Sequence, residues 1–347
     1  MNSTVKIDID EFLERAGKLA MADVRSPKEF EQGHIPGAFN LPLFENEERA
    51  IVGTIYHMAG REQAIEKGLQ IVGPRLKDYV AIAKNQAVDG QILLHCWRGG
   101  MRSDSLAWLL QLSGLRPSVL EGGYKKFRKL VIEELQHVRP LIVLGGMTGS
   151  GKTDIIRELR KIGMQVIDLE KKANHKGSVF GALGQPQQPS QEQFENDLGF
   201  ELLHLKENEP VFIEDESIHI GRIGLPKPFY TRMKEAPMIC IELEKQQRAE
   251  RIYSEYACFD REFLAGVTQQ LNRRMGGDRT QFAVKMIREG KLMEAILSLL
   301  EYYDKTYSHA LLKRDHGQVH RIALEGVNST GHAVQVAAMA KSLGLLS

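Results

Sequence analysis

A cysteine followed closely by glycines and arginines is the first feature of this sequence that points to chemistry. The segment Cys96–Ser103 reads CWRGGMRS and lies between an apolar run and a helical pattern. Backbone N–H groups and the positive end of a helix dipole at such a turn stabilise a thiolate or a bound anion. Because Arg98 and Arg102 add positive charge, the pattern predicts a thiol of lowered pKa that acts as a nucleophile or chalcogen carrier. The expected catalytic residues are Cys96, Arg98 and Arg102, and the rest of the anion-binding loop is Trp97, Gly99, Gly100, Met101 and Ser103.

The other two cysteines lack these surroundings. Cys240 lies inside an apolar run and Cys258 has no basic loop, so both are expected to be inert, buried packing residues. The three cysteines are widely spaced and form no CxxC pair, which argues against a disulfide framework and against a structural zinc site.

A glycine-rich segment in the middle of the chain fits the phosphate-binding pattern G-x-x-x-x-G-K-[ST]. It follows an apolar run and precedes a helical pattern, the setting in which consecutive N–H groups hold phosphate oxygens. Its lysine supplies a point charge and its final hydroxyl can bind Mg²⁺. The expected diphosphate-binding residues are Gly146, Met147, Thr148, Gly149, Ser150, Gly151, Lys152 and Thr153.

Carboxylates and arginines elsewhere in the second half are candidates for the same site. Glu214 and Asp215 end an apolar run, where an acidic side chain could help to bind Mg²⁺. The expected Mg²⁺ ligands are Thr153 and Asp215. An equal alternative is that these carboxylates only mark the solvated end of a strand. Arg248 and Arg251 share one face of a helical pattern, where they either clamp a phosphate or form a solvated basic face.

The elements that must position these residues alternate between strand and helix patterns. A helix is expected to begin at Pro27 with Ser26 as its N-cap, and residues 245–307 are expected to be helical almost throughout. Strands are expected at 20–24, 91–95, 119–120, 141–144, 211–213 and 238–241. Such alternation predicts parallel sheets covered by helices. Pro140 marks a boundary, giving two α/β domains at 1–136 and 137–347, the second a P-loop NTPase-like domain with a helical C-terminal region.

Composition narrows the class of protein. The 347 residues are 42% hydrophobic with a formal net charge of +1, which excludes a disordered chain and gives no global sign of a polyanionic partner. No apolar run is long enough to cross a bilayer and the N-terminus lacks a secretory pattern, so we expect a cytoplasmic protein without a membrane partner.

The first half resembles the rhodanese (sulfurtransferase) family. The resemblance rests on three segments, DVRSPKEF at 23–30, GHIPGAFNLP at 33–42 and EGGY at 121–124. It implies that Cys96 bears a persulfide or perselenide. Trp97, where many sulfurtransferases have arginine, points to an acceptor bulkier than cyanide, and His34 is expected to stabilise a turn rather than act as a base.

A rhodanese-like domain followed by a P-loop domain resembles the tRNA 2-selenouridine synthases over essentially the whole chain, including the segments 168–170, 173–178, 189–195 and 273–277. The resemblance implies that selenium from selenophosphate replaces sulfur at C2 of 2-thiouridine at tRNA wobble position 34. It also implies an S-geranyl-2-thiouridine intermediate made from geranyl diphosphate, because alkylation turns a thiocarbonyl sulfur into a thiolate leaving group. The P-loop would then hold a diphosphate, and Arg98 and Arg102 would hold the selenium donor.

The resemblance also implies partners and cofactors. The expected partners are tRNA, selenophosphate, geranyl diphosphate and an enzyme that supplies selenophosphate, with no tightly bound cofactor besides Mg²⁺ at the P-loop. The expected tRNA-binding residues are Arg273, Arg274 and Arg279, and the basic run Lys125, Lys126, Arg128 and Lys129 is a weaker candidate.

Two other functions remain open from the sequence. One is an ATP-dependent tRNA sulfurtransferase, in which the P-loop activates a substrate oxygen and a Cys96 persulfide delivers sulfur. The other is a non-catalytic RNA-binding module, against which the intact cysteine loop and intact P-loop both argue.

Overall fold

The computed structural model describes residues 5–314, 316–326 and 328–346. The chain divides into two compact units. Unit 1 comprises the residues up to Glu134 together with Ser190–Phe200, and unit 2 comprises Leu135–Pro189 and the residues from Glu201 onward. A short stretch of the second half of the sequence therefore belongs to the unit that holds Cys96.

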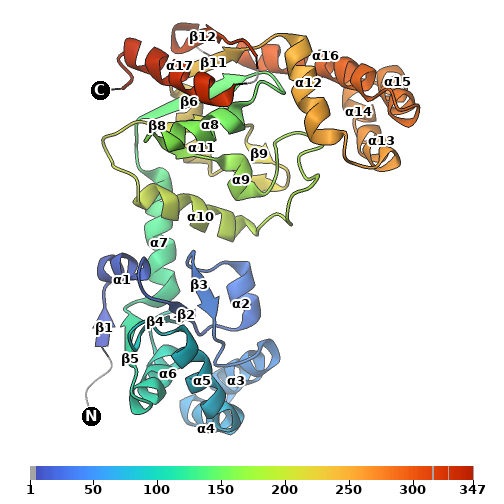
Figure 1. Cartoon of the computed structure of the whole chain (residues 1–347). Helices are drawn as coiled ribbons and strands as arrows, with labels where there is room; N and C mark the ends of the chain where they lie inside the picture. Colours follow the sequence, from blue (N-terminus) through green and yellow to red (C-terminus); the bar gives the residue numbers. More distant parts are fainter. Residues whose placement is uncertain (1–4, 315, 327, 347) are drawn as a thin grey trace. The chain divides into compact units, whose positions relative to one another are not determined.

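Unit 1 is built on a parallel five-stranded sheet with the order β1-β5-β4-β2-β3 (Figure 1). Its strands are β1 (Val5–Ile7), β2 (Met21–Asp23), β3 (Ala38–Asn40), β4 (Gln91–His95) and β5 (Arg116–Leu120). Its helices are α1 (Ile9–Ala16), α2 (Pro27–Gln32), α3 (Asn46–Met58), α4 (Arg61–Val72), α5 (Leu76–Gln86), α6 (Met101–Leu112) and α7 (Gly123–Gln136), which runs to the boundary, and a 3-10 turn η1 spans Gly73–Arg75.

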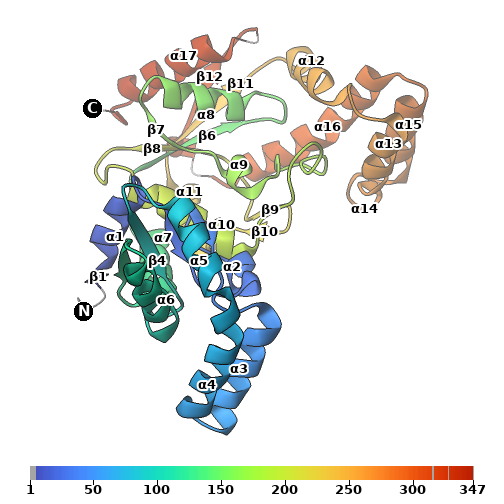
Figure 2. The same cartoon turned by 60° about the horizontal axis from the view of Figure 1, so that its bottom comes forward.

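Local sequence explains the placement of Cys96 in this sheet. β4 is almost fully buried, as its apolar residues predict for a strand covered on both faces. Cys96 follows at the carboxyl end of β4, and α6 begins five residues later at Met101. Ser26 caps α2 with a capping box and Pro27 at the first turn, as expected. The helices α3 and α4 form a hairpin beside this core (Figure 2).

The segment 190–200 completes unit 1. It forms most of α10 (Gln191–Leu203), whose Phe194 and Leu198 are fully buried. Gly199 lies against Val131 of α7 so closely that a Cβ there would be 2.8 Å from the valine Cγ1. Nothing local in the sequence of this segment indicates that it packs on residues more than sixty positions earlier.

Unit 2 is built on a second parallel sheet, with the order β12-β11-β6-β8-β7. Its strands are β6 (Leu141–Gly146), β7 (Gln165–Ile167), β8 (Val211–Glu214), β11 (Met238–Glu242) and β12 (Val319–Ala323), besides an antiparallel pair β9 (His219–Ile220) and β10 (Ile223–Gly224). Its helices are α8 (Lys152–Lys161), α9 (Leu169–Ala173), α11 (Lys227–Glu235), α12 (Lys245–Tyr256), α13 (Arg261–Gln269), α14 (Asn272–Met275), α15 (Gly277–Arg288), α16 (Leu292–Leu311) and α17 (Ser329–Ser342), with a 3-10 turn η2 at His316–Gln318.

The predicted fold class is confirmed. Both sheets are parallel and alternate with helices, and residues 245–307 lie almost entirely in α12–α16. One expectation is wrong: Cys240 is buried in β11, but Cys258 is exposed. Cys258 lies in the turn between α12 and α13, where solvent reaches the side chain. Within the described ranges, no helix is both long enough and apolar enough to cross a membrane.

Candidate functional site

The Cys96 sulfur lies inside a ring of hydrogen-bond donors formed by its own loop. The side chain is 3% exposed, the Gly100 N–H donates to Sγ at 3.3 Å, and the Ser103 hydroxyl donates to Sγ at 3.3 Å. Burial raises the pKa of the thiol. The hydrogen bonds from the Ser103 hydroxyl and from the N–H groups of Gly100, Arg98 and Ser103 outweigh that effect, so the pKa of Cys96 is lowered below its usual value.

The lowered pKa gives a first prediction. Ser103→Ala removes a hydrogen bond that favours the thiolate, so the pKa of Cys96 should rise and the thiolate fraction at neutral pH should fall. The pH dependence of Cys96 alkylation by iodoacetamide should then shift to higher pH. Ser113→Ala, in which the lost hydroxyl donates to the Leu110 carbonyl near the end of α6, is the matched control. An unchanged alkylation midpoint in Ser103→Ala would show that the hydroxyl does not stabilise the thiolate.

Two glycines allow the cysteine loop to pack directly on the turn before α7. Gly99 and Gly123 both have positive φ, at 64° and 58°. A Cβ on Gly123 would lie 2.3 Å from the Cys96 carbonyl oxygen, and one on Gly99 would lie 2.4 Å from the Leu120 carbonyl oxygen. The Tyr124 N–H donates to that Cys96 oxygen at 2.8 Å. Any side chain at these glycines would therefore separate the two backbones and disturb the cysteine loop.

The two arginines of the loop have different surroundings. Arg98 is exposed, and its guanidinium forms no hydrogen bond or ion pair within the described part of the chain, so this charge is available to a bound anion. Arg102 instead donates to Glu29 at 2.8 Å. The charge of Glu29 offsets that of Arg102, and the expected role of Arg102 in holding an anionic donor stays a prediction.

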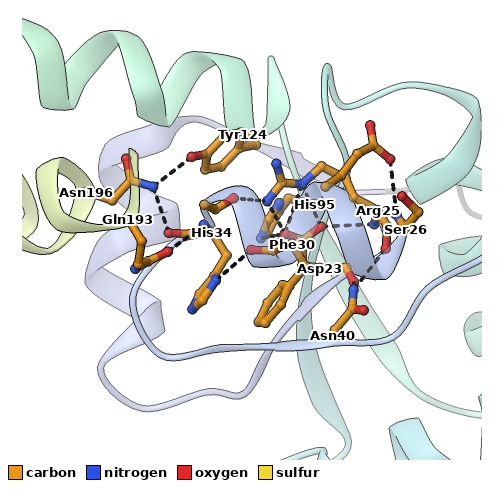
Figure 3. A network of polar contacts seen from close by, with 12 residues as sticks. Asp23, Arg25, Ser26, Phe30, His34, Asn40, His95, Tyr124, Gln193 and Asn196 are labelled. Atoms are coloured by element: carbon orange, nitrogen blue, oxygen red, sulfur yellow. Dashed lines mark hydrogen bonds and ion pairs between the residues drawn. The ribbon is translucent and has the colours of Figure 1, made fainter. Parts of the chain in front are cut away.

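The exposed face beside the sulfur is formed by Trp97, which is 37% exposed and packs at a ring-centroid distance of 5.7 Å from Tyr124. Beneath them the guanidinium of Arg25 lies 3.8 Å from the centre of the Tyr124 ring. The Tyr124 hydroxyl donates to Glu192 at 2.6 Å and accepts from Asn196 at 2.7 Å, so two residues of α10 hold it in place. The contact with Asn196 is drawn in Figure 3.

The same network fixes the turn that contains His34. The His34 backbone donates to Gln193 and accepts from Asn196, and its ring stacks on Phe30 with a centroid separation of 3.9 Å (Figure 3). Its Nδ1 lies 3.0 Å from the Phe30 carbonyl oxygen. These contacts agree with the turn-stabilising role expected for His34.

Arg25 is 1% exposed and forms an ion pair with fully buried Asp23. Asp23→Asn leaves the guanidinium charge buried without its partner, which should lower the free energy of unfolding by about 3–5 kcal/mol. The exposed pair Lys129–Glu133 provides the control, since Glu133→Gln should cost no more than about 1 kcal/mol. Denaturant unfolding of the two variants measures the difference. Equal losses in the free energy of unfolding would show that the buried pair contributes no more to stability than the exposed pair.

In unit 2 the P-loop connects β6 to α8 as the sequence predicts. Gly149 and Gly151 have φ angles of 81° and 82°, which curl the backbone of the loop. The Lys152 ammonium donates to the Gly146 carbonyl at 2.9 Å, and the Tyr307 hydroxyl of α16 accepts from the Gly146 N–H at 2.7 Å.

A cavity of about 550 Å³ opens from this loop. One part of its lining is polar and includes Gly151, Lys152 and Thr153. The other part is apolar and comes from the C-terminal helices: Leu264 on α13, Ile287 on α15 and Leu292, Ile296, Leu299 and Leu300 on α16. The lining therefore fits a ligand that has an anionic head and an apolar tail.

The structure separates the two arginines of α12. Arg248 is 3% exposed and forms a two-bond ion pair with Asp304, so it is not part of a solvated face. Arg251 lines the cavity, pairs with Asp154, and lies so close to Gly151 that a Cβ there would be 2.8 Å from its guanidinium. Arg251 is thus the one of the two that a phosphate bound to the P-loop would meet.

Three glutamates below the P-loop form a buried acidic cluster. Thr153 donates its hydroxyl to Glu170 at 2.8 Å, and the Glu170 N–H donates to Glu214 at 3.2 Å. Burial and the neighbouring Glu170 raise the pKa of Glu214, and the same two causes raise that of Glu216 to about 8. Sequence reasoning missed Glu170 and Glu216 as cavity residues; the acidic run that follows β8 is the only local signal for Glu216.

The residues predicted to bind Mg²⁺ have other partners. Asp215 accepts hydrogen bonds from Lys234 at 2.8 Å and from Arg314 at 3.0 Å. Burial raises the pKa of Asp215, but the two cations outweigh that effect, so the pKa lies below its usual value. The described residues contain no group of three or more histidine, cysteine or acidic side chains that could hold a metal ion. A Mg²⁺ ion at Thr153 and Asp215 stays a prediction.

The predicted tRNA-binding arginines lie on the surface of unit 2. Arg273 and Arg274 on α14 and Arg279 on α15 are exposed. In the basic run of unit 1, Lys125, Lys126 and Lys129 are exposed, whereas Arg128 is half-buried and bonds to Glu195 and Asn196 of α10. Arg128 therefore has a structural role in holding α10.

Comparisons with known proteins agree with both halves of this description. Residues 8–130 match the rhodanese-like domain family, and residues 139–334 match the family described as the tRNA 2-selenouridine synthase AAA domain. Curated relatives named tRNA 2-selenouridine synthase include one from Nitrosomonas europaea, 34% identical over 304 residues, which are 75% of this chain and 78% of the relative.

Two further relatives of the same name extend the match. The protein from Shewanella denitrificans is 32% identical over 90% of this chain and 93% of its own length. The protein from Bdellovibrio bacteriovorus is 39% identical over 69% of this chain and 64% of its own length. The cysteine loop, the P-loop and these matches together show that the chain belongs to the tRNA 2-selenouridine synthase family, a family of enzymes.

Proposed function

We propose that this chain replaces sulfur by selenium at C2 of 2-thiouridine in the wobble position of tRNA, with selenophosphate as the selenium donor. The names of its relatives support tRNA selenation. The lowered pKa of the Cys96 thiol and the free guanidinium of Arg98 beside it supply a nucleophile and a contact for an anionic donor. A separate enzyme would supply selenophosphate, and the exposed loop at Arg98 is where the donor would enter.

We further propose that the sulfur is first alkylated by geranyl diphosphate in unit 2. The observation that carries this proposal is the cavity, because its lining passes from the P-loop to apolar side chains of α13, α15 and α16. Lys152, Arg251 and the P-loop N–H groups would bind the diphosphate. The apolar residues would bury the hydrocarbon chain, which the hydrophobic effect favours at about 25 cal/mol per Å².

The proposed reaction is an alkylation followed by two displacements at C2. The thiouridine sulfur attacks C1 of geranyl diphosphate, the C1–O bond breaks, diphosphate leaves, and the uridine N3 proton goes to solvent. The Cys96 thiolate then attacks C2 and geranylthiolate leaves. Selenium from selenophosphate next forms the C2–Se bond and displaces Cys96, while water hydrolyses the P–Se bond to give phosphate. None of these steps needs nucleotide hydrolysis.

The tRNA would be held by Arg273, Arg274 and Arg279, whose exposure leaves them free to contact phosphates. Replacing all three by glutamine should weaken tRNA binding and reduce its salt dependence, since fewer counterions are released. Filter binding at several salt concentrations measures both quantities. Binding with an unchanged salt slope would place the tRNA elsewhere.

One experiment tests the whole proposal. The full chain is incubated with tRNA containing 2-thiouridine, geranyl diphosphate and selenophosphate, and the nucleosides are analysed by mass spectrometry. We expect S-geranyl-2-thiouridine without selenophosphate and 2-selenouridine with both small molecules. Thiolation of uridine that requires ATP would instead indicate a sulfurtransferase, and tRNA binding with no nucleoside product would indicate a non-catalytic module.

A further inference from the structure

The cavity in unit 2 is lined along one whole face of α16. The residues of α16 that reach it are Leu292, Ile296, Leu299, Leu300, Tyr303 and Tyr307. Their spacing of three, four and seven positions keeps them on the same side of the helix. Residues of α12, α13 and α15, including Ile252, Leu264 and Ile287, also line the cavity.

The helix has a fixed direction relative to the phosphate-binding end. Tyr307 marks that end, because its hydroxyl accepts a hydrogen bond from the Gly146 N–H of the P-loop at 2.7 Å. From there α16 runs away from the sheet toward α13 and α15, with Leu292 near its other end (Figure 2). At about 1.5 Å per residue, Tyr303 lies about 6 Å, Leu299 about 12 Å, Ile296 about 16 Å and Leu292 about 22 Å along the axis from Tyr307.

This spacing matches the repeat of a prenyl chain. An isoprene unit contributes four C–C bonds of about 1.5 Å to an extended chain, or about 5 Å of length. One turn of helix is about 5.4 Å. A chain anchored by its diphosphate at the P-loop therefore advances by about one isoprene unit for each turn of α16.

We propose that the cavity face of α16 determines which lengths of hydrocarbon chain bind. Each lining residue contacts only those chains that are long enough to reach it. The first unit lies against Tyr303 and the second against Leu299 and Leu300. A third unit lies against Ile296, and a fourth against Leu292. The inference rests on the proposed function, since it takes the ligand to be a prenyl diphosphate, and it adds which residues determine chain-length specificity.

The test measures binding of four prenyl diphosphates, with one to four isoprene units, to the full chain by calorimetry. Leu299→Ala should weaken the geranyl, farnesyl and geranylgeranyl compounds by about tenfold and leave the dimethylallyl compound unchanged. Leu292→Ala should weaken only the geranylgeranyl compound, by a similar factor. Leu297→Ala, on the same helix and half-buried but outside the cavity lining, is the control and should change none of the four.

The outcomes separate the two proposals. If both lining variants weaken the binding of all four compounds equally, or if neither weakens any, α16 does not determine chain-length specificity. That conclusion would hold even if geranyl transfer is observed. Binding of inorganic diphosphate as tight as that of every prenyl diphosphate would instead contradict the prenyl substrate itself. Unchanged affinity for inorganic diphosphate in each variant shows that the P-loop, and therefore the fold of unit 2, is intact.

Discussion

Cys96→Ser is expected to abolish the formation of 2-selenouridine, with a loss of at least about a thousandfold in rate. A serine hydroxyl stays protonated near neutral pH, so the donors around Sγ have no anion to stabilise and the nucleophile is lost. Mass spectrometry of nucleosides after incubation of the full chain with tRNA, geranyl diphosphate and selenophosphate measures the loss.

The remaining cysteines provide the controls for this experiment. Cys258→Ser changes an exposed thiol outside both sites and should retain full activity. S-geranyl-2-thiouridine should still accumulate in Cys96→Ser, because the proposed alkylation uses only the residues of unit 2. Loss of both products would overturn the division of the two steps between the two units.

Lys152→Ala is expected to weaken the binding of geranyl diphosphate by about a hundredfold and to reduce geranyl transfer accordingly. The variant removes a cation from the base of the P-loop, and hydrogen bonds to a charged phosphate contribute about 1.5–3 kcal/mol each. Calorimetry with geranyl diphosphate and a single-turnover assay of S-geranyl-2-thiouridine measure the two effects.

Lys161→Ala is the matched control, because this lysine lies at the end of the same helix, is exposed, and has Glu158 as its one ion-pair partner among the described residues. It should leave binding and transfer unchanged. Geranyl transfer at the wild-type rate in Lys152→Ala would contradict the assignment of the diphosphate to the P-loop. Loss of selenation from a pre-geranylated tRNA would mean that Lys152 also acts in the exchange step.

The local parts of both sites could be read directly from the sequence. The apolar run before Cys96, its glycines and the helix after it are contiguous, and so are the strand, loop and helix around Lys152. Such segments fold in the same way wherever they occur, because their hydrogen bonds are made within a few residues. The lowered pKa of Cys96 follows from the same fact, because hydrogen bonds from the Ser103 hydroxyl and from N–H groups of the loop lower it, and not the arginine charges that the sequence suggested.

The side-chain partners of Arg102 and Arg248 were not indicated by the sequence. Their spacing indicated anion contacts, but each guanidinium has a carboxylate partner far away in the sequence, Glu29 for Arg102 and Asp304 for Arg248. A sequence pattern does not specify such partners, because they are set by the packing of separate elements. The expected burial of Cys258 is wrong for a related reason, since the exposure of a residue between two helices depends on how they pack.

By itself, the sequence determined the two parallel sheets, the cysteine loop and the P-loop, because periodicity and turn chemistry are local properties of the chain. Only the tertiary structure decided that residues 190–200 pack beside Tyr124, and that the apolar residues of α13, α15 and α16 line one cavity with the P-loop. The physical reason is that apolar residues at helical spacing bury themselves equally well against any complementary surface. Which surface they meet, and whether a cavity remains between them, depends on contacts between segments far apart in the chain.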